Sequence, residues 1–242
     1  MKAVILAGGA GTRMRPLTYV IPKVMLPIGG RPLLEHTIKY LQSYGVQEFV
    51  VCVAYLKKQI IDAFGDGSEL GVSIAYGQSD SPLGTGGQLK TAEKEVEGTF
   101  LAMNGDIVTS LNIGNLVGSH RANGGVGTIA LKKFDVKIPY GNVTTTGNQI
   151  LRFEEKPTLK YNANAGIYVL EPEIFDHIQV GRTVSLETEV FPGLLAAGKK
   201  LFSYYEDANW ADVGSMADFE RVNDQVLSTN AVSVSQERAS PD

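Results

Sequence analysis

The first half of the chain alternates between short apolar runs and stretches with one apolar face. The apolar runs at residues 3–7, 46–54 and 72–76 are typical of buried strands. Residues 32–41 and 57–64 instead space their apolar side chains as amphipathic helices do. Because buried strands alternate with helices, the pattern predicts a βαβα unit with parallel strands, as in Rossmann-like sheets.

The pattern changes in the second half of the chain. A strand at 99–103, a helix at 112–122 and a strand at 126–132 continue the alternation. Residues 139–155 then break into short apolar stretches separated by turn residues, which predicts a smaller, partly antiparallel lobe facing the first half. The remaining elements are expected in the order strand 162–170, helix 171–177, strand 200–205 and helix 215–226.

Length and composition describe an ordinary globular chain. Its 242 residues suffice for one large α/β domain or two small ones, with 43% apolar and 20% charged residues. The net charge of −4, without any run of Lys and Arg, argues against broad nucleic-acid binding. Phosphates are therefore expected to be held by a few placed cations, which suits a small nucleotide.

The compartment is expected to be the cytoplasm. Cys52 is the single cysteine, so no internal disulfide can form, and its apolar run predicts an inert buried thiol. The apolar run at the N-terminus is too short for a signal peptide. No stretch approaches the roughly 20 apolar residues of a membrane span, so no membrane association is expected.

A bare glycine loop follows the first predicted strand. Residues 8–11 read Gly-Gly-Ala-Gly, where the backbone can come close to a ligand, and Arg13, Arg15 and Lys23 follow. Loop amides and cations together suit a triphosphate, although a plain tight turn is the alternative. The loop is not a dinucleotide fingerprint, because Met14 stands where the third glycine would fall, nor is it a Walker A loop.

Two further segments carry candidate chemistry. Residues 83–87, Leu-Gly-Thr-Gly-Gly, precede a helix expected at 88–95 and can press against a flat base and offer it amides. A flexible helix N-cap is the alternative. Asp106 follows the strand expected at 99–103, at the end where α/β sheets bind ligands, unless it is a turn residue.

The opening as a whole resembles a known family signature. Residues 6–18, Leu-Ala-Gly-Gly-Ala-Gly-Thr-Arg-Met-Arg-Pro-Leu-Thr, with Pro22-Lys23 and Leu26-Pro27, resemble the N-terminus of the sugar-1-phosphate nucleotidyltransferases, or NDP-sugar pyrophosphorylases. Met14 departs from the usual Leu and Val24 from the usual second Pro. Residues 83–87 resemble the family's base-recognition segment, closest to guanylyl-type enzymes that act on mannose and heptose phosphates.

Other motifs of the family follow in its order. They are Gly105-Asp106, Tyr140-Gly141, Glu154-Glu155-Lys156-Pro157, Asn164-Ala-Gly-Ile-Tyr168, the helix segment around Glu187, and Trp210-Ala-Asp-Val-Gly214. The resemblance implies a glycosyltransferase-A-like fold: a Rossmann-like, mixed and mostly parallel sheet flanked by helices, with a smaller antiparallel sugar-binding lobe. It implies one catalytic domain over residues 1–230, with a nucleotide half (1–125), a sugar half (126–230) and a flexible tail (231–242). The chain shows no hexapeptide repeats of the C-terminal β-helix that longer relatives carry, so the catalytic domain alone is expected.

The resemblance also assigns roles to residues. Nucleotide binding falls to Leu6, Ala7, Gly8, Gly9, Gly11, Thr12, Gln78, Gly84, Thr85, Asn104 and Gly105. Binding of the sugar phosphate is assigned to Tyr140, Gly141, Glu155, Lys156, Asn164 and Glu187. On spacing alone, Glu155 and Lys156 would instead be a solvated charge cluster at the end of a strand. Arg13, Lys23 and Lys156 are the implied catalytic residues, and Asp106 and Asp212 the implied ligands of Mg²⁺.

The implied reaction joins an NTP to a sugar 1-phosphate and releases pyrophosphate. GTP and mannose 1-phosphate are the favoured pair, with glucose-1-phosphate thymidylyl, uridylyl or cytidylyl transfer as alternatives. A phosphomonoester has a second pKa near ~6, so the nucleophile is already ionised and needs no general base. A regulatory subunit that binds an NDP-sugar without turnover is the alternative from another class, and the sugar motifs speak against a molybdopterin nucleotidyltransferase. Since relatives are often dimers or tetramers, a homo-oligomer is expected.

Overall fold

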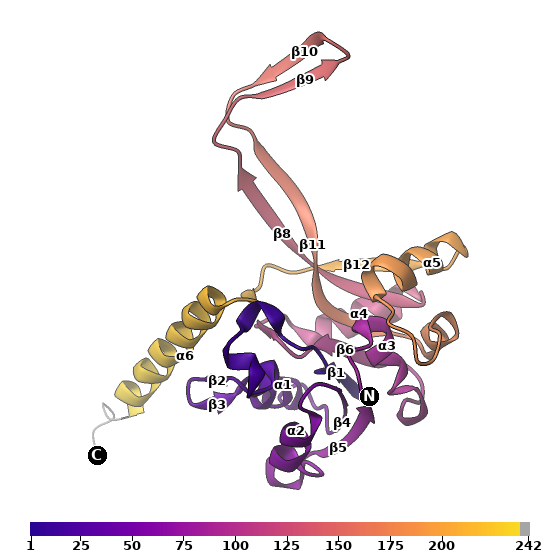
Figure 1. Ribbon diagram of the computed structural model, residues 1–242, viewed down its shortest axis with the longest axis vertical. Helices are drawn as coiled ribbons and strands as arrows, with labels where there is room; N and C mark the ends of the chain where they lie inside the picture. Colours follow the sequence, from indigo (N-terminus) through magenta and orange to yellow (C-terminus); the bar gives the residue numbers. More distant parts are fainter. Residues whose placement is uncertain (238–242) are drawn as a thin grey trace.

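A seven-stranded sheet forms the centre of the molecule. The computed structural model describes residues 1–237, with side chains described through residue 228. The strands lie in the order β12-β8-β11-β6-β1-β4-β5 (Figure 1). Their bounds are β1 Ala3–Leu6, β4 Glu48–Val53, β5 Ser73–Gln78, β6 Phe100–Asn104, β8 Gly127–Lys137, β11 Thr158–Leu170 and β12 Leu201–Tyr205.

The predicted parallel core is confirmed, and it creates a crevice. β1 pairs in parallel with β4 on one side and with β6 on the other, and β4 pairs in parallel with β5. β11 enters antiparallel between β6 and β8, which makes the sheet mixed. Because the chain leaves β1 towards β4 and later returns to its other side as β6, a topological switch point lies at the carboxyl ends of β1 and β6.

Helices cover both faces of this sheet (Figure 1). Ala3 and Ile5 of β1 pack in one apolar cluster with α1 (Leu33–Gln42), α2 (Lys57–Phe64) and α4 (Ile113–Asn123). Val4 and Leu6 point to the opposite face and pack with α3 (Gly84–Lys90) and α5 (Phe191–Ala196). Cys52 lies fully buried in the second cluster, where burial raises the pKa of its thiol to about 12.

A third apolar cluster ties the N-terminal loops to the C-terminal helix. Met14, Leu26 and Leu33 pack there with Val213 and with Val222 of α6, the long helix Met216–Glu237. Two small strand pairs frame the cluster: β2 (Pro27–Ile28) with β3 (Arg31–Pro32), and β7 (Ile107–Thr109) with β13 (Trp210–Asp212). The short helices are η1 Thr12–Met14, η2 Leu17–Tyr19, η3 Lys23–Met25, η4 Ser68–Leu70, η5 Glu93–Glu95, η6 Pro172–His177 and η7 Leu186–Val190.

Two predicted helices were wrong in their bounds. The helix expected at 88–95 forms as α3 over Gly84–Lys90, so the glycine run is its first turn rather than the loop before it. The closing helix expected to end near residue 226 continues to Glu237, since no Gly or Pro interrupts residues 216–237. The predicted flexible tail therefore overlaps this helix, and its last residues, 238–242, lie outside the described residues.

The antiparallel lobe forms, but it does not face the nucleotide half. β8 and β11 stay paired from Gly127–Leu170 outwards to Lys137–Thr158, with one register shift between Asn164 and Tyr168. The β9–β10 hairpin (Asn142–Thr146 and Gln149–Glu154) lies beyond the end of this ribbon, away from the body (Figure 1). The pairing is continuous from Leu131–Asn164 to Lys137–Thr158, and it extends the segment outwards, against the expectation from sequence.

None of the helices described over residues 1–237 combines the length and the apolar character that a bilayer crossing requires.

Replacing Leu101 by Ala tests the central packing. Leu101 is fully buried on β6, between the sheet partners β1 and β11. We expect Leu101→Ala to lower the free energy of unfolding by about 2–5 kcal/mol, because it removes buried methyl groups and leaves a cavity. Urea unfolding followed by circular dichroism measures this. Leu195→Ala on α5, where the side chain is 58% exposed, is the control and should change stability little; equal losses in both variants would contradict the assigned core.

Candidate active site

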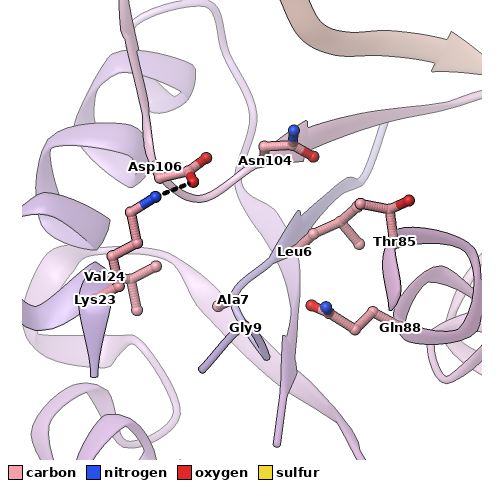
Figure 2. Close-up of a pocket in the computed structure, with 9 residues that line it drawn as sticks. All are labelled: Leu6, Ala7, Gly9, Lys23, Val24, Thr85, Gln88, Asn104 and Asp106. Carbon is pink, nitrogen blue, oxygen red and sulfur yellow. Dashed lines mark hydrogen bonds and ion pairs between the residues drawn. The ribbon is translucent and has the colours of Figure 1, made fainter. Parts of the chain in front are cut away.

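A cavity opens at the carboxyl ends of β1 and β6, where the topology predicts a ligand (Figure 2). It encloses about 150 Å³. Ligand pockets usually enclose about 300–1,000 Å³, so the cavity has room for part of a nucleotide and the rest would lie in the open cleft. Its lining residues are Leu6, Ala7, Gly9, Lys23, Val24, Thr85, Gln88, Asn104 and Asp106.

The glycine loop after β1 is held from both sides. The amide of Gly8 donates a hydrogen bond of 2.7 Å to Oε1 of Gln88. The carbonyl of Gly11 accepts one of 2.8 Å from the hydroxyl of Thr18, and Gly11 has φ +58°. A Cβ on Gly11 would lie 2.9 Å from Cγ2 of Thr18, so both the backbone angle and the space require glycine there. Thr12 follows on the exposed side of the loop.

Lys23 joins two carboxylates that are far apart in sequence. Its Nζ lies 2.5 Å from Oδ2 of Asp106 and 3.7 Å from Oδ1 of Asp212, and its side chain is only 11% exposed. Asp106 lies in the turn between β6 and β7, and Asp212 ends β13, which pairs with β7. The amide of Val213 donates to the carbonyl of Asp106 at 2.9 Å, which fixes the two aspartates beside each other.

The charge at this pair is incompletely neutralised. Burial, and then the charge of Asp106, raises the pKa of the Asp212 carboxyl, while Lys23 and Arg13 oppose the rise. Oδ1 of Asp212 is buried without a hydrogen-bond partner, because Lys23 lies too far away to donate to it. A buried acceptor beside a second carboxylate fits a hard divalent cation.

The described residues contain no group of three or more His, Cys, Asp or Glu side chains placed to hold a metal. Mg²⁺ does not require such a group, because it is usually bound by one or two carboxylates together with substrate phosphates. The pair of Asp106 and Asp212 therefore remains compatible with the predicted magnesium site.

Arg13 lies against Gly214, next to Asp212. A Cβ on Gly214 would lie 3.0 Å from Nη1 of Arg13, so a side chain there would displace this guanidinium by a few tenths of an ångström. The last residue of the Trp-Ala-Asp-Val-Gly motif thus places the cation of the N-terminal loop beside the aspartates. Sequence reasoning assigned no role to Gly214, although its position at the end of that motif was a signal.

The second glycine segment, residues 83–87, was expected to offer its amides to a base, but it packs against the segment around Val184 instead. The amides of Gly86 and Gly87 both donate to the carbonyl of Val184, at 2.9 and 3.2 Å, so they are already paired. A Cβ on Gly84 would lie 2.5 Å from the same carbonyl oxygen, which shows that these glycines allow α3 to pack closely on that segment. Side chains of the same helix, Thr85 and Gln88, line the cavity instead (Figure 2).

Gln88 was missed by sequence analysis. Its side chain is 7% exposed, accepts from the Gly8 amide, and lines the cavity from α3. A signal was available, because Gln88 follows Gly84 by four residues and therefore lies on the same face of the helix.

A chain of hydrogen bonds connects α3 to the expected sugar side. The hydroxyl of Thr85 donates to Oε2 of Glu187 at 2.8 Å, and the hydroxyl of Tyr168 donates to Oε1 of Glu187 at 3.3 Å. Nδ2 of Asn164 donates to the Tyr168 hydroxyl at 2.8 Å. Two predicted sugar contacts, Asn164 and Glu187, are thus brought beside a predicted nucleotide contact.

Two polar groups between β1, β6 and β11 complete this side. The amide of Gly105 donates to the carbonyl of Leu6 at 3.0 Å, which closes the turn before Asp106. Oδ1 of Asn104 is buried without a hydrogen-bond partner. A Cβ on Gly166 would lie 2.6 Å from Nδ2 of Asn104, so the glycine of the Asn-Ala-Gly motif leaves the space that Asn104 occupies.

The structure does not bring the other predicted contacts to this cavity. Tyr140, Gly141, Glu155 and Lys156 lie on the outward ribbon, where Tyr140 is 76% exposed and Nζ of Lys156 lies 3.7 Å from Glu155. Gln78 ends β5, is exposed, and does not line the cavity. These assignments stay predictions.

The fold places this chain among α/β proteins that bind ligands at the carboxyl edge of the sheet. A family model described as "Nucleotidyl transferase" matches residues 2–229. The chain therefore belongs to that family, and the predicted fold class is confirmed.

Curated relatives carry related names. The chain is 38% identical, over 96% of its length, to "Mannose-1-phosphate guanyltransferase" from Kluyveromyces lactis, and 39% identical, over 90%, to "Mannose-1-phosphate guanylyltransferase" from Mycobacterium tuberculosis. It is 35% identical, over 94%, to "UTP--glucose-1-phosphate uridylyltransferase" from Synechocystis sp.. The chain spans 66, 62 and 64% of the length of these three relatives.

Solved structures share the fold. HddC from Yersinia pseudotuberculosis complexed with GMP-PN matches with a TM-score of 0.75 at 26% identity, over 93% of this chain and 99% of that one. A putative glucose-1-phosphate thymidylyltransferase from Bacillus anthracis, in complex with sucrose, matches with a TM-score of 0.75 at 25% identity, over 94% and 95%.

Replacing Lys23 by Met tests the pairing that organises the site. In EDTA, Lys23→Met leaves two adjacent carboxylates without their cation. We expect the free energy of unfolding to fall by about 1.5–3 kcal/mol, the range for hydrogen bonds between charged groups. Lys58→Met is the control, because its pair with Asp62 is exposed and should matter little. Urea unfolding measures both; a Lys23 variant as stable as the wild type would contradict the assigned pairing.

Proposed function

We propose that this chain transfers a nucleotidyl group from an NTP to a sugar 1-phosphate and releases pyrophosphate. The observation that carries the proposal is the meeting of Lys23, Asp106 and Asp212 beside the glycine loop, at the carboxyl edge of the sheet. GTP and mannose 1-phosphate are the proposed substrates, which the names of several relatives support. The uridylyltransferase among the relatives makes UTP with glucose 1-phosphate the alternative pair.

The proposed reaction is a direct displacement at the α-phosphorus. An oxygen of the sugar phosphate forms the new P–O bond, and the bond to the β-phosphate breaks, with its electron pair leaving on pyrophosphate. Because the phosphomonoester is mostly a dianion at neutral pH, no side chain has to remove a proton. The protein must orient the two phosphates in line and neutralise their charge.

The residues of the site divide this work. Amides of the loop from Gly9 to Thr12 receive the phosphates, since the amide of Gly8 already donates to Gln88, and Arg13, placed beside Asp212, neutralises the departing pyrophosphate. Asp106 and Asp212 would hold Mg²⁺, which when bound supplies charge neutralisation at the α-phosphate. Lys23, already between the two carboxylates, is then available to bind a phosphate oxygen.

Selection of the base and of the sugar falls to different side chains. Thr85 and Gln88 line the cavity from α3 and are placed to contact the nucleotide. Glu187 accepts directly from Thr85, and the Tyr168 hydroxyl links Asn164 to Glu187, so the polar groups of Asn164 and Glu187 are held in place for sugar hydroxyls. The proposal locates the enzyme in the cytoplasm, where nucleoside triphosphates are supplied.

A substrate screen tests the proposed function. Pyrophosphate release is measured with Mg²⁺ for GTP, dTTP, UTP, CTP and ATP, each against mannose, glucose, N-acetylglucosamine and heptose 1-phosphates. We expect GTP with mannose 1-phosphate to dominate. UTP with glucose 1-phosphate as the dominant pair would replace the proposed substrates, and binding of an NDP-sugar without any turnover would contradict the transferase proposal.

Asp106→Asn tests the assigned metal ligand. The amide keeps the shape of the side chain but loses its charge, so we expect kcat to fall by a factor on the order of 10²–10³ through lost electrostatic stabilisation of the reacting phosphate. Circular dichroism should show an unchanged fold. Asp62→Asn, an exposed helix residue paired with Lys58, is the matched control and should keep full turnover. Near-normal kcat in Asp106→Asn would remove this residue from the mechanism.

Lys156→Ala tests the assigned sugar-phosphate contact. Loss of its ammonium should raise KM for the sugar 1-phosphate by a factor on the order of 10, the equivalent of one charged hydrogen bond, and leave KM for the NTP nearly unchanged. Lys160→Ala removes another exposed lysine of the same ribbon and serves as the control. Equal increases in both KM values would contradict the assignment.

A further inference from the structure

Gln88 carries a hydrogen-bond donor whose direction is fixed by the backbone. Its side chain extends from α3 towards the loop after β1 and is 7% exposed (Figure 2). The amide of Gly8 donates a hydrogen bond of 2.7 Å to Oε1 of Gln88. A backbone N–H group can only donate, so the oxygen of the side-chain amide must face Gly8. Nε2, the donor end of Gln88, is therefore directed away from that N–H group.

Packing around Gln88 holds this orientation. A Cβ on Gly8 would lie 3.0 Å from both Cδ and Oε1 of Gln88, so the amide group lies directly against the loop. The start of α3 is anchored as well, because the amides of Gly86 and Gly87 donate to the carbonyl of Val184. A flip of the Gln88 amide would place two donors against each other and lose a buried hydrogen bond, which is unfavourable.

The donor end of Gln88 is open to a ligand. Within residues 1–228, Nε2 donates to no other group. It is not enclosed by protein either, in contrast to Oδ1 of Asn104 and Oδ1 of Asp212, which are buried without a partner. Because Gln88 lines the cavity, an occupant of the cavity can reach Nε2. A fixed donor of this kind selects for an acceptor on that occupant.

The end of the cavity near Gln88 suits a base rather than a phosphate. Lys23 and Asp106 are the charged residues among those that line the cavity, and Figure 2 shows them across it from Gln88. Phosphates and a divalent cation belong at that charged end. Leu6 and Ala7 also line the cavity and provide apolar surface for a flat ring.

A fixed donor distinguishes two classes of base. Guanine carries a carbonyl oxygen at position 6, and uracil and thymine carry one at position 4, whereas adenine and cytosine carry an amino group at the equivalent positions. The carbonyl oxygen accepts from an amide N–H group, but an amino group would meet it donor to donor. Leaving a buried polar group unpaired in this way lowers affinity by about 10–100-fold.

We infer that Gln88 is a specificity-determining residue, which donates from Nε2 to the carbonyl oxygen of a keto base and thereby discriminates against adenine and cytosine. This rests on the proposed function. The contact is available to both GTP and UTP, the proposed and the alternative nucleotide. Gln88 therefore selects the class of base, and the choice between purine and pyrimidine depends on other groups.

Nucleotides that differ at this ring position test the inference in the wild type. The keto nucleotide preferred in the substrate screen is compared with its amino counterpart, either GTP with 2,6-diaminopurine riboside triphosphate or UTP with CTP. Isothermal titration calorimetry with Mg²⁺ measures both affinities. We expect the keto nucleotide to bind at least about tenfold more tightly. Equal affinities, or a preference for ATP or CTP in the screen, would overturn the inference.

Gln88→Glu tests the residue itself. The variant keeps an acceptor for the Gly8 amide but replaces the donor by a second acceptor, and at pH about 8 the introduced carboxyl group is ionised. Its negative charge weakens binding of every triphosphate, so the readout is the ratio of the keto to the amino affinity. We expect this ratio to fall at least about tenfold. Gln47→Glu makes the same change at an exposed position before β4 and should keep the wild-type ratio.

The outcomes separate selection of the base from support of the loop. If Gln88 only held Gly8 in place, Gln88→Glu would weaken both nucleotides by the same factor, and that result would overturn the inference. If the variant does not fold, as judged by circular dichroism, the comparison in the wild type decides. Selective binding of the keto nucleotide without turnover would contradict the proposed function and support the inference. Turnover without this selectivity would overturn the inference alone.

Discussion

The contact of Lys23 with Asp106 and Asp212 is the interaction on which the site depends. It joins the helix η3 near the N-terminus, the turn after β6, and the strand β13 near the C-terminal helix. Without a cation between them, two neighbouring carboxylates repel each other, and Oδ1 of Asp212 is already without a hydrogen-bond partner. The apolar cluster of Met14, Val213 and α6 presses these segments together against that repulsion. A divalent cation bound between the two carboxylates would neutralise this charge.

Close packing against neighbouring atoms accounts for several glycines around this centre. Gly11, Gly84 and Gly214 each stand where a Cβ would lie within about 3 Å of a neighbouring atom, respectively Thr18, Val184 and Arg13. Each therefore fixes the distance between two elements of the site. The β8–β11 ribbon and the β9–β10 hairpin extend away from these elements (Figure 1), so the expected sugar-phosphate contacts are divided between the ribbon and the side of the cavity.

Sequence patterns predicted the parallel core because its buried strands are apolar throughout and its helices have one apolar face. The site at the carboxyl edge was predicted from the glycine loop and Asp106, and the structure brings Lys23 and Asp212 close to Asp106. The outward direction of the β8–β11 ribbon was not predictable, since turn residues specify a hairpin but not its orientation on the rest of the molecule. The role of Gln88 was not predicted from the sequence either, because its contact with Gly8 depends on how α3 packs against β1.

Binding of Mn²⁺, followed by electron paramagnetic resonance without nucleotide, tests the central claim most directly. If Asp106 and Asp212 accept a divalent cation in place of Lys23, the wild type binds one Mn²⁺ per chain, and Asp106→Asn and Asp212→Asn lose that binding while Asp62→Asn retains it. Equal Mn²⁺ binding by the wild type and by both site variants would contradict the claim, and the carboxylate pair would then be a structural partner of Lys23 rather than a metal site.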